Sequence, residues 1–260
     1  MLNLDKVGIT LKIIFDGYDF IQSDIGKMLV TENKIPHIIR TTFLPTLYEG
    51  VEEFLAYCKY NGNGYLPNEL MEKYHCGLYS LDSVFDNNNP WKDKSYVLFN
   101  SGIISQLKKN IELDDIKFWV CPAYNEIGQV EAIGFRVVDI NTVRKCFKWI
   151  FTCGNNIIYG KEHIDKNKTV YVVEGFRDYI ALKECGYNVI GLGSVFISEK
   201  QKQYIDTLDP IILLDNDKFG IHKSLQYSKF YKTAILTGTE HKDAYDAFIN
   251  GDEIKICQIQ

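Results

Sequence analysis

The sequence lacks several patterns that mark common classes of protein. Its 7 cysteines include no Cys-x-x-Cys pair, which argues against a zinc ribbon or a disulfide framework and favours a reducing cytoplasm. No apolar run is long enough to cross a bilayer, so we expect no contact with a membrane. The first residues lack a basic stretch followed by an apolar core, so we also expect no secretion signal.

A basic excess, which usually marks a nucleic-acid-binding protein, is also absent, because the net charge is −5. Only the middle of the chain is net positive: residues 101–170 carry 10 Lys and Arg against 8 Asp and Glu. Residues 171–260 carry 10 against 13. Such an acidic excess is understandable if several carboxylates bind divalent cations, which reverse the local field.

The last third of the chain alternates between short apolar runs and helical patterns. The runs are rich in β-branched residues and predict buried strands at 169–173, 188–192, 211–214 and 233–236. The helical patterns predict helices at 177–185, 198–208 and 222–230, the second of which opens with a capping box at Ser198. Strand–helix alternation implies a parallel sheet, in which ligands gather at the carboxyl ends of the strands.

The middle of the chain favours antiparallel pairing. Apolar runs on either side of a turn at 125–128 predict a β-hairpin within residues 118–139. The first hundred residues are harder to interpret. We expect four further elements in these two regions: strands at 9–15, 147–152 and 156–159 and a helix at 51–60.

Carboxylates follow the predicted strands, where the ligand-binding edge of the sheet is expected. Six of them lie at strand ends or just beyond: Glu174, Asp178, Asp215, Asp217, Asp243 and Asp246. Carboxylates that meet at one edge repel one another unless a cation is present, so their convergence would be costly without a function. Oxygen ligands of this number suit Mg²⁺, which also binds substrate phosphates.

Four motifs carry these acids and the turn between them. They are Val173-Glu174-Gly175-Phe176-Arg177-Asp178, Gly191-Leu192-Gly193-Ser194, Leu214-Asp215-Asn216-Asp217-Lys218-Phe219-Gly220 and Lys242-Asp243. Together they resemble the TOPRIM domain of bacterial and phage DNA primases of the DnaG-like type. The resemblance implies that Glu174, Asp215 and Asp217 are catalytic and bind Mg²⁺ or Mn²⁺, and that Asp178 and Asp243 are further metal ligands. The family's closing motif usually reads Lys-Asp-Pro-Asp, and Asp246 departs from it by one position.

A fainter similarity precedes this region. The segments Gly134-Phe135-Arg136-Val137-Val138-Asp139, Lys148-Trp149 and Ile158-Tyr159-Gly160 are similar to the stretch before TOPRIM in primases. This similarity implies that Arg136, Lys148 and Lys161 bind nucleotide and template, and Lys242 of the closing motif is placed with them. We therefore predict an N-terminal region of uncertain fold at 1–116, an antiparallel β segment at 117–168 and a TOPRIM catalytic domain at 169–260.

The expected fold class is α/β, with a C-terminal TOPRIM domain whose parallel sheet is flanked by helices, preceded by a mixed α+β primase-like region. The resemblance implies a DNA-directed RNA polymerase of primase type. Such a nucleotidyltransferase makes short RNA primers from ribonucleoside triphosphates on a single-stranded DNA template, with a replicative helicase as a further candidate partner. Because no Cys–His zinc module precedes the core, we expect a phage or mobile-element enzyme in the cytoplasm of a bacterial host.

Two other functions stay open. A TOPRIM-type nuclease would use the same metals to cut a phosphodiester, although some nuclease relatives prefer glutamate at the position of Asp178. A non-catalytic nucleic-acid-binding replication subunit would keep the fold as a platform, but the complete set of acids argues against it.

Overall fold

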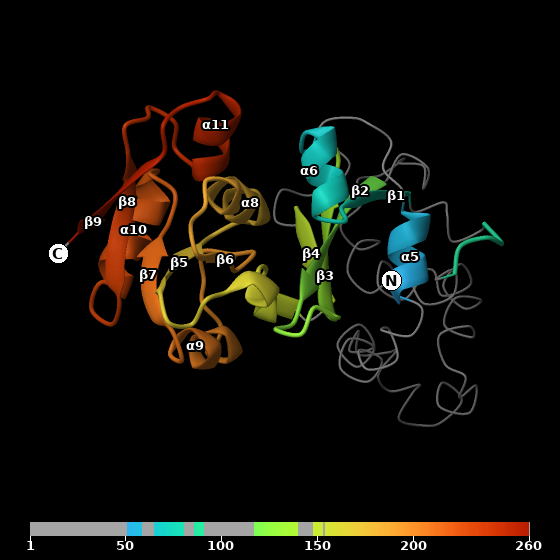
Figure 1. Ribbon diagram of the computed structural model, residues 1–260, viewed down its shortest axis with the longest axis horizontal. Coiled ribbons are helices and arrows are strands. Elements are labelled where there is room, and N and C mark those ends of the chain that lie inside the picture. Colours follow the sequence, from blue (N-terminus) through green and yellow to red (C-terminus); the bar gives the residue numbers. More distant parts are fainter. Residues whose placement is uncertain are drawn as a thin grey trace, which may run out of the picture. The chain divides into compact units, whose positions relative to one another are not determined.

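The structure, a computed structural model, describes residues 51–58, 65–80, 86–90, 117–139, 148–152 and 154–259 (Figure 1). The chain divides into two compact units: Met1–Cys121 with Gly134–Cys153, and Pro122–Ile133 with Gly154–Gln260. The domain boundaries predicted at residues 117 and 169 differ from this division and stay predictions. Within the described ranges, no helix is both long and apolar enough to span a membrane.

In its described residues, the first unit contains two short helices and most of a four-stranded sheet. The sheet has the order β1-β2-β3-β4, and its strands are β1 (Gly77–Ser80), β2 (Lys117–Tyr124), β3 (Val130–Val137) and β4 (Trp149–Phe151). The helices are α5 (Val51–Tyr57) and α6 (Asn68–Lys73). Phe54 of α5 packs against the rings of Tyr79 and Phe135, so this helix covers the sheet. The helix predicted at 51–60 is confirmed, whereas the strand predicted at 9–15 lies outside the described residues.

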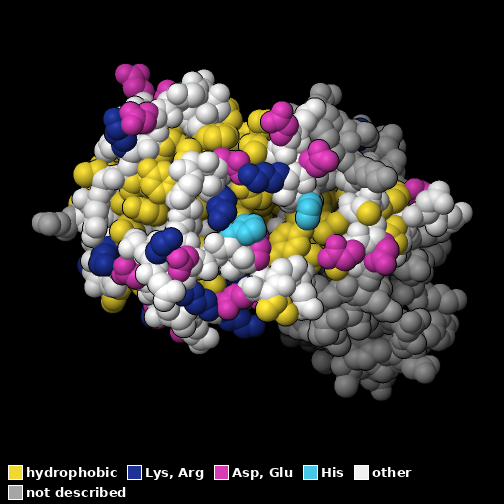
Figure 2. All heavy atoms as spheres, in the orientation of Figure 1, with side chains coloured by type: hydrophobic (Ala, Val, Ile, Leu, Met, Phe, Trp, Pro, Cys, Tyr) yellow, Lys and Arg dark blue, Asp and Glu magenta, His cyan; other side chains and the backbone are white. Residues whose placement is uncertain are grey.

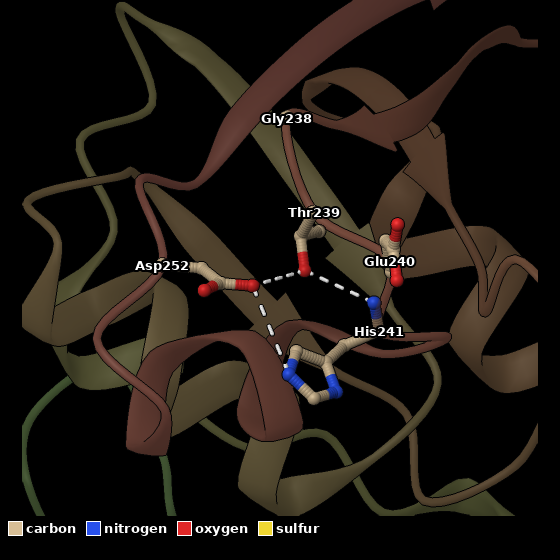
Figure 3. Close-up of a pocket in the computed structure, with 5 residues that line it drawn as sticks. All are labelled: Gly238, Thr239, Glu240, His241 and Asp252. Atoms are coloured by element: carbon tan, nitrogen blue, oxygen red, sulfur yellow. Dashed lines mark hydrogen bonds and ion pairs between the residues drawn. The ribbon is translucent and has the colours of Figure 1, made fainter.

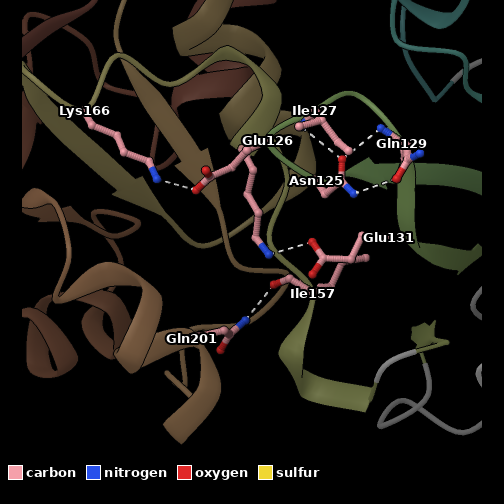
Figure 4. Close-up of polar contacts among 9 residues, drawn as sticks. Asn125, Glu126, Ile127, Gln129, Glu131, Ile157, Lys166 and Gln201 are labelled. Atoms are coloured by element: carbon pink, nitrogen blue, oxygen red, sulfur yellow. Dashed lines mark hydrogen bonds and ion pairs between the residues drawn. The ribbon is translucent and has the colours of Figure 1, made fainter.

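Strands β2 and β3 form the hairpin that the sequence predicts, and its tip belongs to the second unit. In the turn, Gly128 has a φ of 79°, a left-handed conformation that favours glycine. The Asn125 side chain accepts a hydrogen bond from the Gln129 N–H at 2.9 Å (Figure 4). Lys166 pairs with Glu126 at 2.6 Å, which ties the tip to the rest of the second unit.

The strand pair predicted after the hairpin is only half correct. β4 pairs antiparallel with β3, which confirms the strand predicted at 147–152. Residues 156–159 form no strand: a 3₁₀ turn (η6, Gly154–Asn156) ends at Asn156, and Tyr159 makes only an isolated bridge to Gly191. Gly191 ends a strand of the other sheet, so the chain has already left the first sheet at this point.

The second unit is built on a five-stranded sheet of order β6-β5-β7-β8-β9. Its strands are β5 (Thr169–Val173), β6 (Val189–Gly191), β7 (Asp209–Leu213), β8 (Lys232–Thr237) and β9 (Lys255–Ile259). The first four of these are parallel, and β9 runs antiparallel to β8. The parallel sheet predicted for the last third is therefore confirmed, with an antiparallel edge strand that the sequence analysis did not predict.

Four helices alternate with these strands along the yellow-to-red part of Figure 1: α8 (Phe176–Glu184), α9 (Glu199–Ile205), α10 (Lys218–Tyr227) and α11 (Ala244–Ile249). The capping box predicted at Ser198 is present, because Ser198 and Gln201 each accept a hydrogen bond from the other's backbone N–H. Helix α10 begins at Lys218 rather than at residue 222, because Asp217 caps it. Helix α11 was not predicted.

Buried apolar residues fix the strands of the second unit. Val170 and Val172 of β5 and Ile212 of β7 belong to one buried cluster, which also contains Ile205 of α9. Alternation along a strand turns the intervening residues to the opposite face of the sheet, the side on which helix α8 packs against β6 and α11. Apolar packing thus holds the strands in register, and the polar residues cluster where the strands end.

Candidate catalytic carboxylate site

The candidate site lies at the carboxyl edge of the parallel sheet. Val173 of β5 is the register partner of Leu213 of β7, so Glu174 and Asp215 leave neighbouring strands at the same edge. Asp243 follows β8, which borders β7 on its other side. The strand order therefore brings together acids that are far apart in the sequence, as the resemblance implied.

Asp215 is the most strongly perturbed of these acids. Burial is the main cause that raises the pKa of its carboxyl from 3.8 to about 8. The charges of Asp178, Glu174 and Asp243 act in the same direction, and the charge of Lys242 opposes them. Asp215 therefore holds a proton at neutral pH unless a cation takes the place of that proton.

The carboxyls of Glu174 and Asp178 are perturbed in the same sense. Burial, followed by the charges of Asp178 and Asp217, raises the pKa of Glu174. Burial and the charge of Asp243 raise the pKa of Asp178 to about 6. The Asp178 carboxylate also accepts a hydrogen bond from the Tyr245 N–H at 3.2 Å, which links α8 to the start of α11.

Two of the acids cap helices. The exposed side chain of Asp217 accepts hydrogen bonds from the N–H groups of Phe219 and Gly220 at 2.9 and 2.8 Å. The buried carboxylate of Asp243 accepts one from the Asp246 N–H at 2.8 Å. Capping explains why Asp217 and Asp243 stand at the starts of helices. The shared edge of the sheet explains why the acids lie close enough to repel one another.

Lys242 is the one predicted basic residue that belongs to this edge. Its ammonium group lies 3.3 Å from the Asp243 carboxylate, and its side chain is 59% exposed. Burial lowers the pKa of Lys242, but the charge and hydrogen bond of Asp243 and the charge of Asp215 together outweigh it, so that the pKa is raised. Lys242 thus carries a positive charge at the rim of the site.

Asn216 was missed by the sequence analysis, although it stands between two predicted ligands. Its N–H donates to the Lys242 carbonyl at 2.6 Å and its side-chain amide donates to the Leu236 carbonyl at 2.9 Å. Asn216 thereby fastens the end of β7 to the segment that carries Asp243. Its amide oxygen is buried and has no hydrogen-bond partner among the described residues.

The donor groups of the carboxylate site decide which cation it suits. Within the described part of the chain, no three His, Cys, Asp or Glu side chains form a group that could hold a metal ion. The chemistry of the donors nevertheless fits Mg²⁺ or Mn²⁺, because the site offers hard carboxylate oxygens. The raised pKa values of Glu174 and Asp215 also favour a cation at this site, because too little positive charge lies nearby to stabilise the ionised carboxylates.

Arg136 and Lys148, predicted to bind template or nucleotide, lie in the first unit. The guanidinium group of Arg136 lies 5.5 Å from the ring centroid of Tyr65 and 5.6 Å from that of Trp149. Lys148 is exposed, and its carbonyl accepts a hydrogen bond from the Val137 N–H. Arg136 thus contacts two aromatic side chains, and its role in binding template stays a prediction.

Lys161 is engaged within the second unit. Its ammonium group pairs with Glu131 of the hairpin tip at 2.6 Å and lies 4.9 Å from the ring centroid of Tyr204. Only 12% of its side chain is exposed. These contacts favour a structural role, in which Lys161 joins the hairpin to the 3₁₀ turn η7 (Lys161–His163).

A second polar cluster, absent from the predicted set, adjoins the site. It lines an open pocket formed by Gly238, Thr239, Glu240, His241 and Asp252 (Figure 3). The Thr239 hydroxyl donates to Asp252, and the His241 N–H donates to Thr239 at 3.0 Å. The polar run between the strand predicted at 233–236 and Lys242 is the sequence signal that could have revealed this cluster.

The surface charge is mixed. On the face shown in Figure 2, the coloured Lys and Arg side chains lie among Asp and Glu side chains rather than in one basic patch. Hydrophobic side chains reach the same surface between them. This face therefore offers local clusters of charge and no extended basic surface.

No protein-family model matches the sequence. Curated relatives are DNA primases from two strains of Helicobacter pylori, 29% and 28% identical over 209 residues. The matches cover 73% of this chain and 34% of each relative, so the chain spans about a third of their length.

Solved structures agree in fold. A DNA primase domain from Pseudomonas aeruginosa matches with a TM-score of 0.50 and 19% identity, over 72% of this chain and 65% of that chain. The RNA polymerase domain of Mycobacterium tuberculosis primase DnaG matches with a TM-score of 0.50 and 14% identity, over 96% and 80%. In sequence and in its mixed α/β fold, the chain is thus similar to DNA primases of the DnaG-like type, and the predicted resemblance is confirmed.

Proposed function

We propose that this chain carries the polymerase site of a DNA primase-like enzyme, which makes short RNA primers on single-stranded DNA by metal-dependent nucleotidyl transfer. The observation that carries the proposal is the convergence of Glu174, Asp178, Asp215 and Asp243 at the carboxyl edge of one parallel sheet, with the pKa of Asp215 raised to about 8. In this proposal the second unit is a TOPRIM domain. The similarity to DNA primases supports the assignment.

The residues of the edge have separate roles in this proposal. Glu174, Asp215 and Asp217 hold the divalent cation, with Asp178 and Asp243 as further ligands. When bound, the cation neutralises phosphate charge and lowers the pKa of the attacking hydroxyl. Because the site offers no nucleophilic side chain for this reaction, its contribution is positioning and electrostatics.

Basic residues complete the proposed enzyme. Lys242 stands at the rim with an exposed side chain, which suits contact with the triphosphate of an incoming ribonucleotide. Arg136 and Lys148 are proposed to hold the template strand, and a replicative helicase is a candidate partner. We propose the cytoplasm of a bacterial host, with a phage or mobile element as the source.

Incubation of the protein with single-stranded DNA, labelled ribonucleotides and Mg²⁺ or Mn²⁺ tests this function. We expect new short RNA from the wild type and none from Glu174→Gln or Asp215→Asn. Glu199→Gln removes an exposed acid of α9 outside the site and should leave the yield unchanged. Cleavage of the DNA without any incorporation of nucleotides would instead support the TOPRIM nuclease.

A further inference from the structure

Two phenylalanine rings lie exposed beside the carboxylate site. Phe196 is 55% exposed and Phe219 is 50% exposed, and their ring centroids are 6.0 Å apart. Phe219 follows the predicted ligand Asp217 by two residues and donates its N–H to that carboxylate. Phe196 lies on the connection after β6, a strand that ends at the same edge of the sheet. Large apolar side chains at such a place favour a ligand that covers them.

The exposed ring of Phe196 is carried by a segment that is fixed on both sides. The Tyr227 hydroxyl of α10 donates to the Val195 carbonyl at 3.0 Å and accepts from the Ile197 N–H at 3.1 Å. The Ser194 hydroxyl accepts from the Phe196 N–H at 3.1 Å. The ring is therefore presented to solvent by an ordered backbone, which lowers the entropy lost when a ligand binds.

One lysine lies over both rings. Lys223 of α10 places its ammonium group 4.4 Å from the ring centroid of Phe196 and 6.0 Å from that of Phe219. The Gln226 side chain accepts a hydrogen bond from this ammonium group at 3.0 Å. Residues 218–239 contain four lysines and no Asp or Glu, although residues 171–260 as a whole carry an acidic excess.

Aromatic rings beside a cation match the chemistry of an unpaired nucleotide. A base stacks on an aromatic side chain whatever its sequence, and the adjoining phosphate is attracted by a lysine. We propose that Phe196, Phe219 and Lys223, named here the aromatic platform, bind an unpaired base of a single-stranded nucleic acid next to the carboxylate site. This inference rests on the proposed function and gives it a specific contact surface for the polynucleotide.

Binding to two oligomers of equal length tests the platform without any catalysis. One is a short oligothymidylate, and the other is abasic, so that it carries the same phosphates and no bases. Fluorescence anisotropy in EDTA should show that Phe196→Ala and Phe219→Ala each lose at least about fivefold in affinity for the oligothymidylate, the effect of one lost stacking contact. Neither variant should change its affinity for the abasic oligomer.

Charge and exposure supply the matched controls. Lys223→Gln should weaken binding of both oligomers and reduce the slope of log affinity against log salt by about 0.7, as expected for one phosphate contact on a single strand. Phe230→Ala, which removes a ring that is 76% exposed, should bind both oligomers like the wild type. Phe219→Trp keeps an aromatic face and should retain the affinity. Equal melting temperatures exclude unfolding as the cause of any loss.

Photocrosslinking locates the contact directly. An oligomer that contains 5-iodouracil should attach to the peptides that carry Phe196 or Phe219, and DNA and RNA versions distinguish template from product. Unchanged binding of both alanine variants, or crosslinks only to other peptides, overturns the platform even if the wild type makes RNA. Base-dependent losses in a protein that makes no RNA would uphold the platform and overturn the proposed polymerase.

Discussion

At the scale of single residues, the acids of the carboxylate site are held by different forces. Asp217 is exposed and its carboxylate caps α10, whereas Asp215 is half-buried and burial, followed by the charges of neighbouring acids, raises the pKa of its carboxyl. Substitutions at the two positions should therefore have different effects on folding stability and on metal binding.

Replacement of Asp217 should distinguish its two roles. Asparagine caps helices about as well as aspartate. In EDTA the free energy of unfolding of Asp217→Asn should therefore lie within about 0.5 kcal/mol of the wild-type value. Asp217→Ala loses the cap and should be destabilised by about 1 kcal/mol. Both variants should lose RNA synthesis and gain less stability from Mg²⁺. Denaturation with and without Mg²⁺ measures this, and a full metal response in Asp217→Asn would show that this side chain is no ligand.

The pKa of Asp215 makes the metal-free protein sensitive to pH. Between pH 4 and 8 the folded state keeps a proton that the unfolded state, with an ordinary pKa of 3.8, has lost. The unfolded state then binds fewer protons, so stability should fall as the pH rises through this window. Asp178, whose pKa is raised to about 6, adds to the fall at the lower end.

Urea denaturation in EDTA at several pH values checks this prediction. Asp215→Asn should be less sensitive to pH than the wild type, and Glu199→Gln should follow the wild type. Equal pH slopes in Asp215→Asn and the wild type would mean that the carboxyl of Asp215 ionises normally in the folded protein.

The sequence identified the acids but not the groups that hold them. Glu174, Asp215 and Asp243 stand in motifs that a pattern can reveal. Asn216 and Tyr245 act through backbone and amide hydrogen bonds, and such contacts depend on which strands become neighbours. That information is absent from local spacing.

At the scale of elements, strands rich in β-branched residues were predictable, and short polar elements were not. Residues 169–173 were predicted as a strand with the bounds of β5, because apolar side chains face the core on both sides of the sheet. Strand β9 has four exposed residues and lies at the edge, so no buried pattern marks it. Helix α11 is too short for a recognisable period.

Gly220 of α10 should tolerate no side chain. A Cβ at this position would lie 2.1 Å from the backbone oxygen of Asp215, and the backbone cannot move aside without distorting the fold. Gly220→Ala should therefore destabilise the protein, although alanine favours a helix by about 1 kcal/mol over glycine. Leu225→Ala on the same helix removes a side chain that is 61% exposed and should be nearly neutral. Thermal melts of both variants test this, and a more stable Gly220→Ala would contradict the close approach.

At the scale of the whole molecule, cation binding should appear as stability. A cation that binds only the folded state stabilises it by RT ln(1 + [L]/Kd), which is about 2.7 kcal/mol at a hundredfold excess over Kd. We expect Mg²⁺ to raise the melting temperature of the wild type and of Glu199→Gln equally. Asp215→Asn should gain clearly less. A melting temperature of the wild type that does not change with Mg²⁺ would count against a metal at this edge.

The net charge of −5 means that any binding of single-stranded DNA depends on few contacts. Arg136→Ala should reduce the slope of log affinity against log salt by about 0.7 if its guanidinium group meets one phosphate. The contacts of Arg136 with Tyr65 and Trp149 predict an additional loss of stability in this variant. Salt titrations of Arg136→Ala and Arg136→Lys check both effects, and identical slopes in all three proteins would place Arg136 away from the DNA.

The hairpin tip affects how this chain can be divided into fragments that fold. Residues 122–133 belong to the second unit, where Glu131 holds Lys161 and Glu126 holds Lys166, yet they precede the rest of that unit in the sequence. A fragment that starts at residue 154 or 169 therefore lacks one of its own pieces. Such a fragment should fold poorly alone and should recover when a peptide of the β2–β3 hairpin is added in trans, as in fragment complementation.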